Sequence, residues 1–155
     1  MSTQNKRGMA IAAMSALAIV AIGCGDDESE ESGDAEAAIE EVTLIADDRD
    51  GYSFELSDTP TAETTSVVFD NQGEEEHFLV FARLNEGYTL DEAVELQGEK
   101  GSTVTYVEDG AKPGESRTFE ITKPLEPGEY VMLCPIPSKE GPHFELGQLE
   151  EFTIE

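Results

Sequence analysis

"LEPGEYVMLCPIPSKEGPHFELGQLEEFTIE", residues 125–155, joins two short stretches rich in β-branched and aromatic residues through a proline- and glycine-bearing loop. In the first stretch Tyr130, Met132 and Cys134 alternate with their neighbours, which predicts a strand with one buried and one wetter face. The second stretch ends the chain as another predicted strand. The loop between them carries a cysteine, a histidine and a glutamine, which are side chains able to bind a metal ion.

Six further runs of the same kind precede this segment, at residues 41–46, 52–56, 65–69, 77–84, 102–107 and 116–121. Turn formers separate the runs, as in "DDRDG", "DNQG" and "EDGAKPGE". About eight strands in a little over a hundred residues predict an all-β domain, a Greek-key sandwich or barrel.

One segment has a helical pattern instead. Thr89 is a predicted N-cap with Glu92 three residues later, which is the spacing of a capping box, and Gly98 is placed to end the helix. The predicted apolar stripe consists of Leu90, Ala93, Val94 and Leu96. We therefore expect one short helix between two strands.

The N-terminal residues predict an export signal. Lys6 and Arg7 precede an apolar run of fourteen residues, which is shorter than the roughly 20 that a helix needs to cross a bilayer. The sequence "AIGC" that ends at Cys24 resembles a bacterial lipobox, and this resemblance implies that Cys24 is lipidated and tethers the protein to a membrane. A plain secretory signal is the alternative.

The segment that follows is acidic and has no aromatic residues, which is typical of a disordered tether. We therefore expect a lipoprotein signal peptide at residues 1–23, a tether at residues 24–41 and one folded domain at residues 42–155. In either version of the signal the mature protein is extracytoplasmic, in the periplasm or at the cell surface.

The chain is strongly acidic, with a formal net charge of -26 at pH 7. Without the predicted signal, seven basic residues remain against 35 acidic ones, a formal charge of -28. This charge argues against nucleic acid as a partner and favours a cationic one. The alternative is that the charge keeps the protein soluble, as anionic surfaces do in a salty medium.

Cysteine and histidine are scarce in the folded domain. Cys134 is its only cysteine, so the domain has no internal disulfide, and an exported thiol is expected to be buried or bound to metal. His77 opens a predicted strand, and eight residues separate Cys134 from His143, with Gln148 further on. Two imidazoles, one thiolate and one weak ligand match a mononuclear blue-copper centre. Each residue alone also has a simpler explanation, such as a buried free thiol.

Two segments resemble the cupredoxin family, which includes plastocyanin, azurin and the copper domains of nitrite reductases. "FDNQGEEEHFLVF", residues 69–81, is similar to the family's Asn-x-Gly turn followed by the first histidine, with Phe78 where the family usually has Asn. Residues 125–155 are similar to its closing segment. The resemblance implies a cupredoxin-like Greek-key β-sandwich with one type 1 copper, equatorial ligands His77, Cys134 and His143, and Gln148 as the axial ligand.

A site closed by four protein ligands has no open position for a substrate. The resemblance therefore implies a monomeric one-electron carrier with no catalytic residues, which exchanges electrons with a redox protein that has a basic face. Nitrite reduction and multicopper oxidation need further histidines, and the two histidines of the chain already belong to this site. Two alternatives remain: a metal-free cupredoxin-like interaction domain, and extracytoplasmic copper storage or delivery, which the single methionine after the signal, Met132, disfavours.

Overall fold

The computed structural model describes residues 38–155, so the predicted signal peptide and Cys24 lie outside the described residues. All eight predicted strands and the predicted helix are present, together with a second, four-residue helix. In chain order the elements are β1 (Glu41–Asp47), β2 (Ser53–Leu56), β3 (Ser66–Asn71), β4 (His77–Leu84), α1 (Leu90–Glu95), β5 (Thr103–Ala111), β6 (Ser116–Glu120), β7 (Gly128–Leu133), α2 (His143–Leu146) and β8 (Leu149–Ile154).

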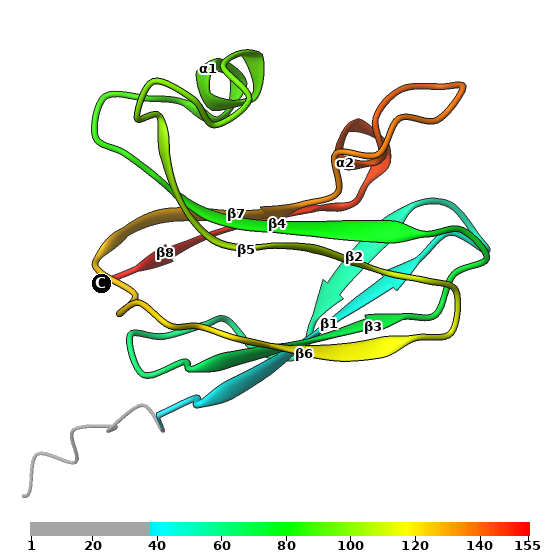
Figure 1. Ribbon diagram of the computed structural model, residues 1–155, viewed down its shortest axis with the longest axis horizontal. Coiled ribbons are helices and arrows are strands. Elements are labelled where there is room, and N and C mark those ends of the chain that lie inside the picture. Colours follow the sequence, from blue (N-terminus) through cyan, green and yellow to red (C-terminus); the bar gives the residue numbers. More distant parts are fainter. Residues whose placement is uncertain (1–37) are drawn as a thin grey trace, which may run out of the picture. The chain divides into compact units, whose positions relative to one another are not determined.

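The strands form two four-stranded sheets that face each other, which confirms the predicted β-sandwich (Figure 1). One sheet has the order β2-β1-β3-β6 and the other the order β5-β4-β7-β8. Neighbouring strands are antiparallel except for β1 and β3, which are parallel and pair from Glu41 with Ser66 to Ala46 with Asn71. No helix among residues 38–155 is long and apolar enough to cross a membrane.

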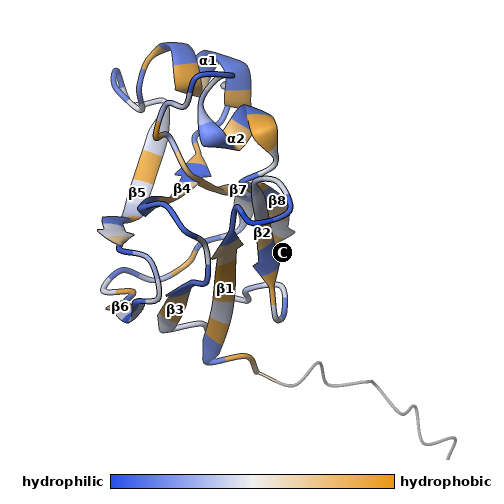
Figure 2. Ribbon diagram, turned by 90° about the vertical axis from the view of Figure 1, so that its right-hand side faces the viewer, coloured by the Kyte–Doolittle hydropathy of each residue, from blue (hydrophilic) through white to orange (hydrophobic). Residues whose placement is uncertain are grey.

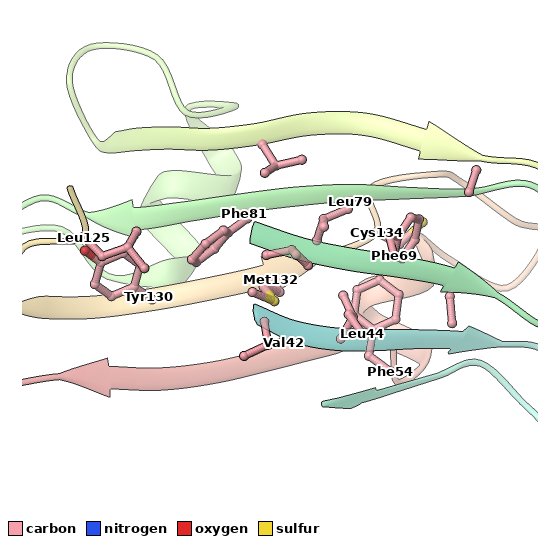
Figure 3. Close-up of a cluster of buried hydrophobic side chains, with 14 of the residues drawn as sticks. Val42, Leu44, Phe54, Phe69, Leu79, Phe81, Leu125, Tyr130, Met132 and Cys134 are labelled. Carbon is pink, nitrogen blue, oxygen red and sulfur yellow. The ribbon is translucent and has the colours of Figure 1, made fainter. Parts of the chain in front are cut away.

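The main core lies between the sheets and comes from strand residues that alternate in burial. In β1, Val42, Leu44 and Ala46 are buried while the residues between them are partly exposed, and Figure 2 shows β1 largely orange between hydrophilic ends. Figure 3 shows Cys134 at one end of this core near Phe69, and Tyr130 at the other end. β7, the strand that leads to the loop, is thus packed into the core from Tyr130 to Cys134, the residue that follows the strand.

The outer face of β7 differs from the prediction. Val131 and Leu133 were expected on the wetter face, yet both are buried, because they pack in a second apolar cluster with Leu90 and Val94 of α1 and Phe144 of α2. Both helices lie on this outer side of the β5-β4-β7-β8 sheet (Figure 1). Alternation within one strand cannot reveal a covering that comes from distant segments.

Helix α1 begins as the sequence predicts. The Thr89 hydroxyl accepts a hydrogen bond from the Glu92 N–H at 3.3 Å, and the Glu92 carboxylate accepts one from the Thr89 N–H at 2.9 Å, which completes the capping box. After the helix, Gly98 has a φ of +72° and donates its N–H to the Ala93 carbonyl at 2.9 Å. Gln97, with a φ of +51°, is the first left-handed residue after the C-cap Leu96, and its N–H donates to the Val94 carbonyl at 3.0 Å. The helix therefore ends in a Schellman motif with Gly98 in the second position.

Candidate metal centre

Three predicted ligands meet at one end of the sandwich. His77 is the first residue of β4, Cys134 directly follows β7, and His143 is the first residue of α2. All three are buried, and one potential ligand atom from each lies within 4.8 Å of the others. The Nδ1 atoms of the two histidines are 3.3 Å apart, and the Cys134 Sγ is 3.5 Å from the His143 Nδ1. Two imidazole nitrogens and one sulfur therefore converge on a single point.

Backbone hydrogen bonds hold the loop that carries two of these residues. The Cys134 N–H donates to the Gln148 carbonyl at 3.1 Å, and the Phe144 N–H donates to the Cys134 carbonyl at 3.0 Å. The His143 N–H donates to the Ile136 carbonyl at 2.9 Å. The ends of the loop are thus tied together, and α2, which the sequence did not predict, is the turn that directs His143 inward.

The sulfur of Cys134 has a backbone partner. The N–H of Phe78 donates to the Cys134 Sγ at 3.3 Å. Burial raises the pKa of the Cys134 thiol, and the Phe78 N–H acts in the opposite direction. Phe78 stands where the cupredoxin family usually has Asn, but this contact comes from the main chain and does not depend on the side chain at that position.

His77 is fully buried and has a carboxylate at its outer nitrogen. Its Nε2 lies 3.0 Å from the Asp48 Oδ2, and the Asp48 side chain is only 7% exposed. Burial lowers the pKa of His77, and the nearby Asp48 charge opposes this change. The imidazole is therefore held at Nε2 while its Nδ1 faces His143 and Cys134.

The turn before His77 is ordered by a buried amide. The Asn71 Nδ2 donates to the Glu75 carbonyl at 2.8 Å and to the Ala111 carbonyl at 2.9 Å, and its Oδ1 accepts the Gly73 N–H at 2.9 Å. Asn71 thereby satisfies both halves of its side chain and ties the β3–β4 turn to β5. This local order positions the start of β4, and with it His77.

His143 is covered from outside. The Tyr52 ring lies over it with ring centroids 4.2 Å apart, and the Tyr52 hydroxyl donates to the Glu75 Oε2 at 3.1 Å. His143 is only 1% exposed. Its Nε2 is 3.6 Å from the same Glu75 oxygen, which is outside hydrogen-bond distance. Tyr52 and Glu75 thus form a polar and aromatic cover over the second histidine.

Gln148 lies beside His77 rather than among the three converging atoms. Its Nε2 donates to the Asp47 carbonyl at 3.2 Å and lies 3.4 Å from the His77 Nε2. Its Oε1 is buried and has no hydrogen-bond partner among the described residues. A buried amide oxygen without a partner is uncommon, and one available role for it is as a ligand.

The donor set fits a copper ion. A thiolate with two imidazoles is the equatorial set of a type 1 copper centre, and a glutamine oxygen is one of the weak axial ligands that such centres accept. The unpartnered Gln148 Oε1 and the close approach of both Nδ1 atoms and the sulfur are consistent with a place for one cation. No other such group of histidine, cysteine and acidic residues occurs within residues 38–155.

Sequence reasoning missed the β1–β2 turn, residues 47–52, which contacts the site at three points. The Asp47 carbonyl accepts from Gln148, Asp48 contacts His77, and Tyr52 covers His143. The only signal was "DDRDG", which is typical of an ordinary turn. Because the turn lies far from the ligands along the chain, its sequence alone does not connect it with them.

Solved structures with the same architecture include an auracyanin from Roseiflexus castenholzii in its dithionite-reduced form. It aligns with a TM-score of 0.55 at 22% identity, over 76% of this chain and 98% of the auracyanin. The domain has the cupredoxin fold. Auracyanin A from Chloroflexus aurantiacus, described as a "blue" copper protein, aligns with a TM-score of 0.48 at 18% identity, over 74% of this chain and 99% of its own. No protein-family model and no curated protein matches the chain.

The cupredoxin fold accounts for the placement of the cluster. β4 and β7 are antiparallel neighbours in one sheet, so the start of β4 lies beside the end of β7. His77 and Cys134 are therefore adjacent although 56 residues separate them along the chain. The resemblance found in the sequence is confirmed at the level of the fold.

Proposed function

We propose that this protein binds one copper ion as a type 1 centre and transfers single electrons. The observation that carries the proposal is the buried convergence of His77, Cys134 and His143, with potential ligand atoms within 4.8 Å of one another. When bound, copper supplies one-electron chemistry by alternating between Cu(II) and Cu(I). The chain's own residues hold the ligand atoms beside the ends of two central strands and keep them buried, away from water.

Gln148 is proposed as the fourth, axial ligand. Its buried Oε1, which has no hydrogen-bond partner among the described residues, supports this role. With four protein ligands the centre has no position for a substrate, and the histidines of the chain are already used. We therefore propose an electron carrier and not an enzyme.

The surface around His143 supports a cationic redox partner. Glu74, Glu75 and Glu76 are exposed in the turn that leads to His77, and Glu75 belongs to the cover of His143. Electrons leave a buried centre over the shortest path, so a partner with a basic face is expected to dock on this acidic rim.

The proposed carrier acts as a monomer outside the cytoplasm and is anchored through lipid on Cys24. The mass of the N-terminal peptide of the mature protein tests the anchor.

The test of copper binding is the colour of the protein. Titration of the reduced, purified full chain with Cu(II) is expected to give an intense visible thiolate-to-copper band that saturates at one ion per chain. The Cys134→Ser variant, which keeps a side chain of similar size, is expected to lack the band because the thiolate is absent. A folded, reduced protein that develops no band contradicts the proposed function. A band that persists in Cys134→Ser contradicts the ligand assignment.

A further inference from the structure

The carboxylate of Asp48 has more partners than a solvent-exposed turn residue normally has. Its Oδ1 accepts the Glu74 N–H at 2.9 Å, and its Oδ2 accepts the Glu75 N–H at 2.9 Å. The same Oδ2 lies 3.0 Å from the His77 Nε2. Asp48 follows β1 in one sheet, whereas His77 begins β4 in the other. The contact therefore crosses the sandwich and joins the two sheets at the metal centre.

These partners determine where the proton on His77 resides. Both oxygens of Asp48 face N–H donors, so the side chain acts as an acceptor only, which is the ionised carboxylate. The Nε2 of His77 must then donate, and the Nδ1 of a neutral imidazole carries the free lone pair. That Nδ1 is the atom facing His143. The carboxylate thus selects the form of His77 that can bind a metal through Nδ1.

The neighbouring backbone leaves room for this contact and for little else. A Cβ at Gly73 would lie 2.7 Å from the Asp48 Oδ2 and 2.8 Å from the His77 Nε2, so a larger residue would push the two apart. The other polar atom near Nε2 is the Gln148 Nε2, which is itself a donor and uses the Asp47 carbonyl as its acceptor. Asp48 is therefore the acceptor available to His77 at this position.

We propose that Asp48 is a positioning residue of the copper centre, forming a carboxylate–histidine–metal relay that orients His77 and strengthens it as a ligand. The inference rests on the proposed copper site and deepens it. A carboxylate behind a ligating imidazole raises the electron density that the ring donates, which favours the more highly charged Cu(II) over Cu(I). Asp48 thereby holds the reduction potential below the value the same ligands have without it.

The test compares two substitutions that remove the same charge from the same turn. Asp48→Asn retains the size of the side chain but places an amide NH2 against an N–H donor, because one of its two terminal atoms no longer accepts. Asp50→Asn is the matched control, since Asp50 is exposed. The full chain is loaded with copper, and Cu(II) affinity and reduction potential are measured for both variants and for the unaltered protein.

Asp48→Asn is expected to weaken Cu(II) binding by about 10- to 100-fold, as loss of an outer partner of a metal-bound histidine does. Its reduction potential is expected to rise, by about 59 mV for each tenfold loss of Cu(II) affinity relative to Cu(I). Asp50→Asn is expected to retain both properties. If the two variants show the same affinity and potential, Asp48 acts only as a charge or a turn cap, and the proposal is overturned.

A measurement on the unaltered chain decides the matter even where Asp48→Asn does not fold. Long-range proton–nitrogen correlation spectra of the reduced, copper-free full chain are expected to show the His77 proton on Nε2, because Asp48 and not a metal then selects the tautomer. A proton on Nδ1 overturns the proposed role of Asp48. An unaltered protein that takes up no copper overturns the proposed function instead, so the two failures are distinguishable.

Discussion

The ligand loop, residues 134–148, and the β1–β2 turn, residues 47–52, meet at the same site and contribute to it in different ways. The loop supplies the Cys134 sulfur and the His143 imidazole, which converge with His77, and it also carries the buried amide of Gln148. The turn supplies no ligand but contacts Gln148, His77 and His143 from outside. The loop thus provides two of the three converging side chains, whereas their surroundings include a segment far away along the chain.

The loop approaches the turn closely at Gly147. This residue has a φ of +131°, and a Cβ there would lie 2.2 Å from the Tyr52 carbonyl oxygen. Gly51, inside the turn, has a φ of +117° and no atom within 4 Å of such a Cβ. Both glycines therefore have backbone angles that are unfavourable for other residues. Only Gly147 also lies close to another segment, at the Tyr52 carbonyl.

The largest effect is expected from Gly147→Ala compared with Gly51→Ala. Gly51→Ala should lower the free energy of unfolding by about 1–3 kcal/mol through backbone strain alone. Gly147→Ala should lower it further and alter the visible spectrum of the copper-loaded protein, because the loop must move away from the turn. Chemical denaturation and absorption spectra measure both. Equal losses of stability and unchanged spectra would show that the contact does not order the site.

Gln148→Met tests the contribution of the loop itself. A thioether is a softer ligand than an amide oxygen and favours Cu(I), so the reduction potential is expected to rise, on the order of 59 mV for a tenfold change in relative affinity. The control is Gln72→Met, because Gln72 is exposed on the preceding turn. Voltammetry gives both values. A potential identical to that of the control would remove Gln148 from the ligand set.

The smallest effect is expected from Tyr52→Phe. This change keeps the ring over His143 and removes only the hydroxyl that donates to Glu75. The free energy of unfolding should fall by about 1 kcal/mol or less, with the visible band retained. Tyr52→Ala, which also removes the ring, should change the band by opening His143 to water. If both variants leave the band unchanged, the aromatic cover has no influence on the centre.

Much of the fold could be predicted from short-range patterns. Each strand appears as an apolar or β-branched run between turn formers, and the capping box of Thr89 and Glu92 predicted α1. The short helix α2 was not predicted, because four residues leave no helical periodicity to detect. The expectation that Val131 and Leu133 lie on a wetter face was wrong, because residues from two other segments cover them.

The amino-acid sequence alone identifies the atoms that are available to a metal. One thiol and two histidines in the folded domain allow a single combination, and the structure brings all three together. The orientation of those atoms depends on contacts that form only in the folded domain. Asp48 reaches His77 because the end of β1 and the start of β4, which belong to opposing sheets, lie at the same end of the sandwich. Ligand identity is a property of residues, whereas ligand orientation depends on neighbours that folding brings from distant parts of the chain.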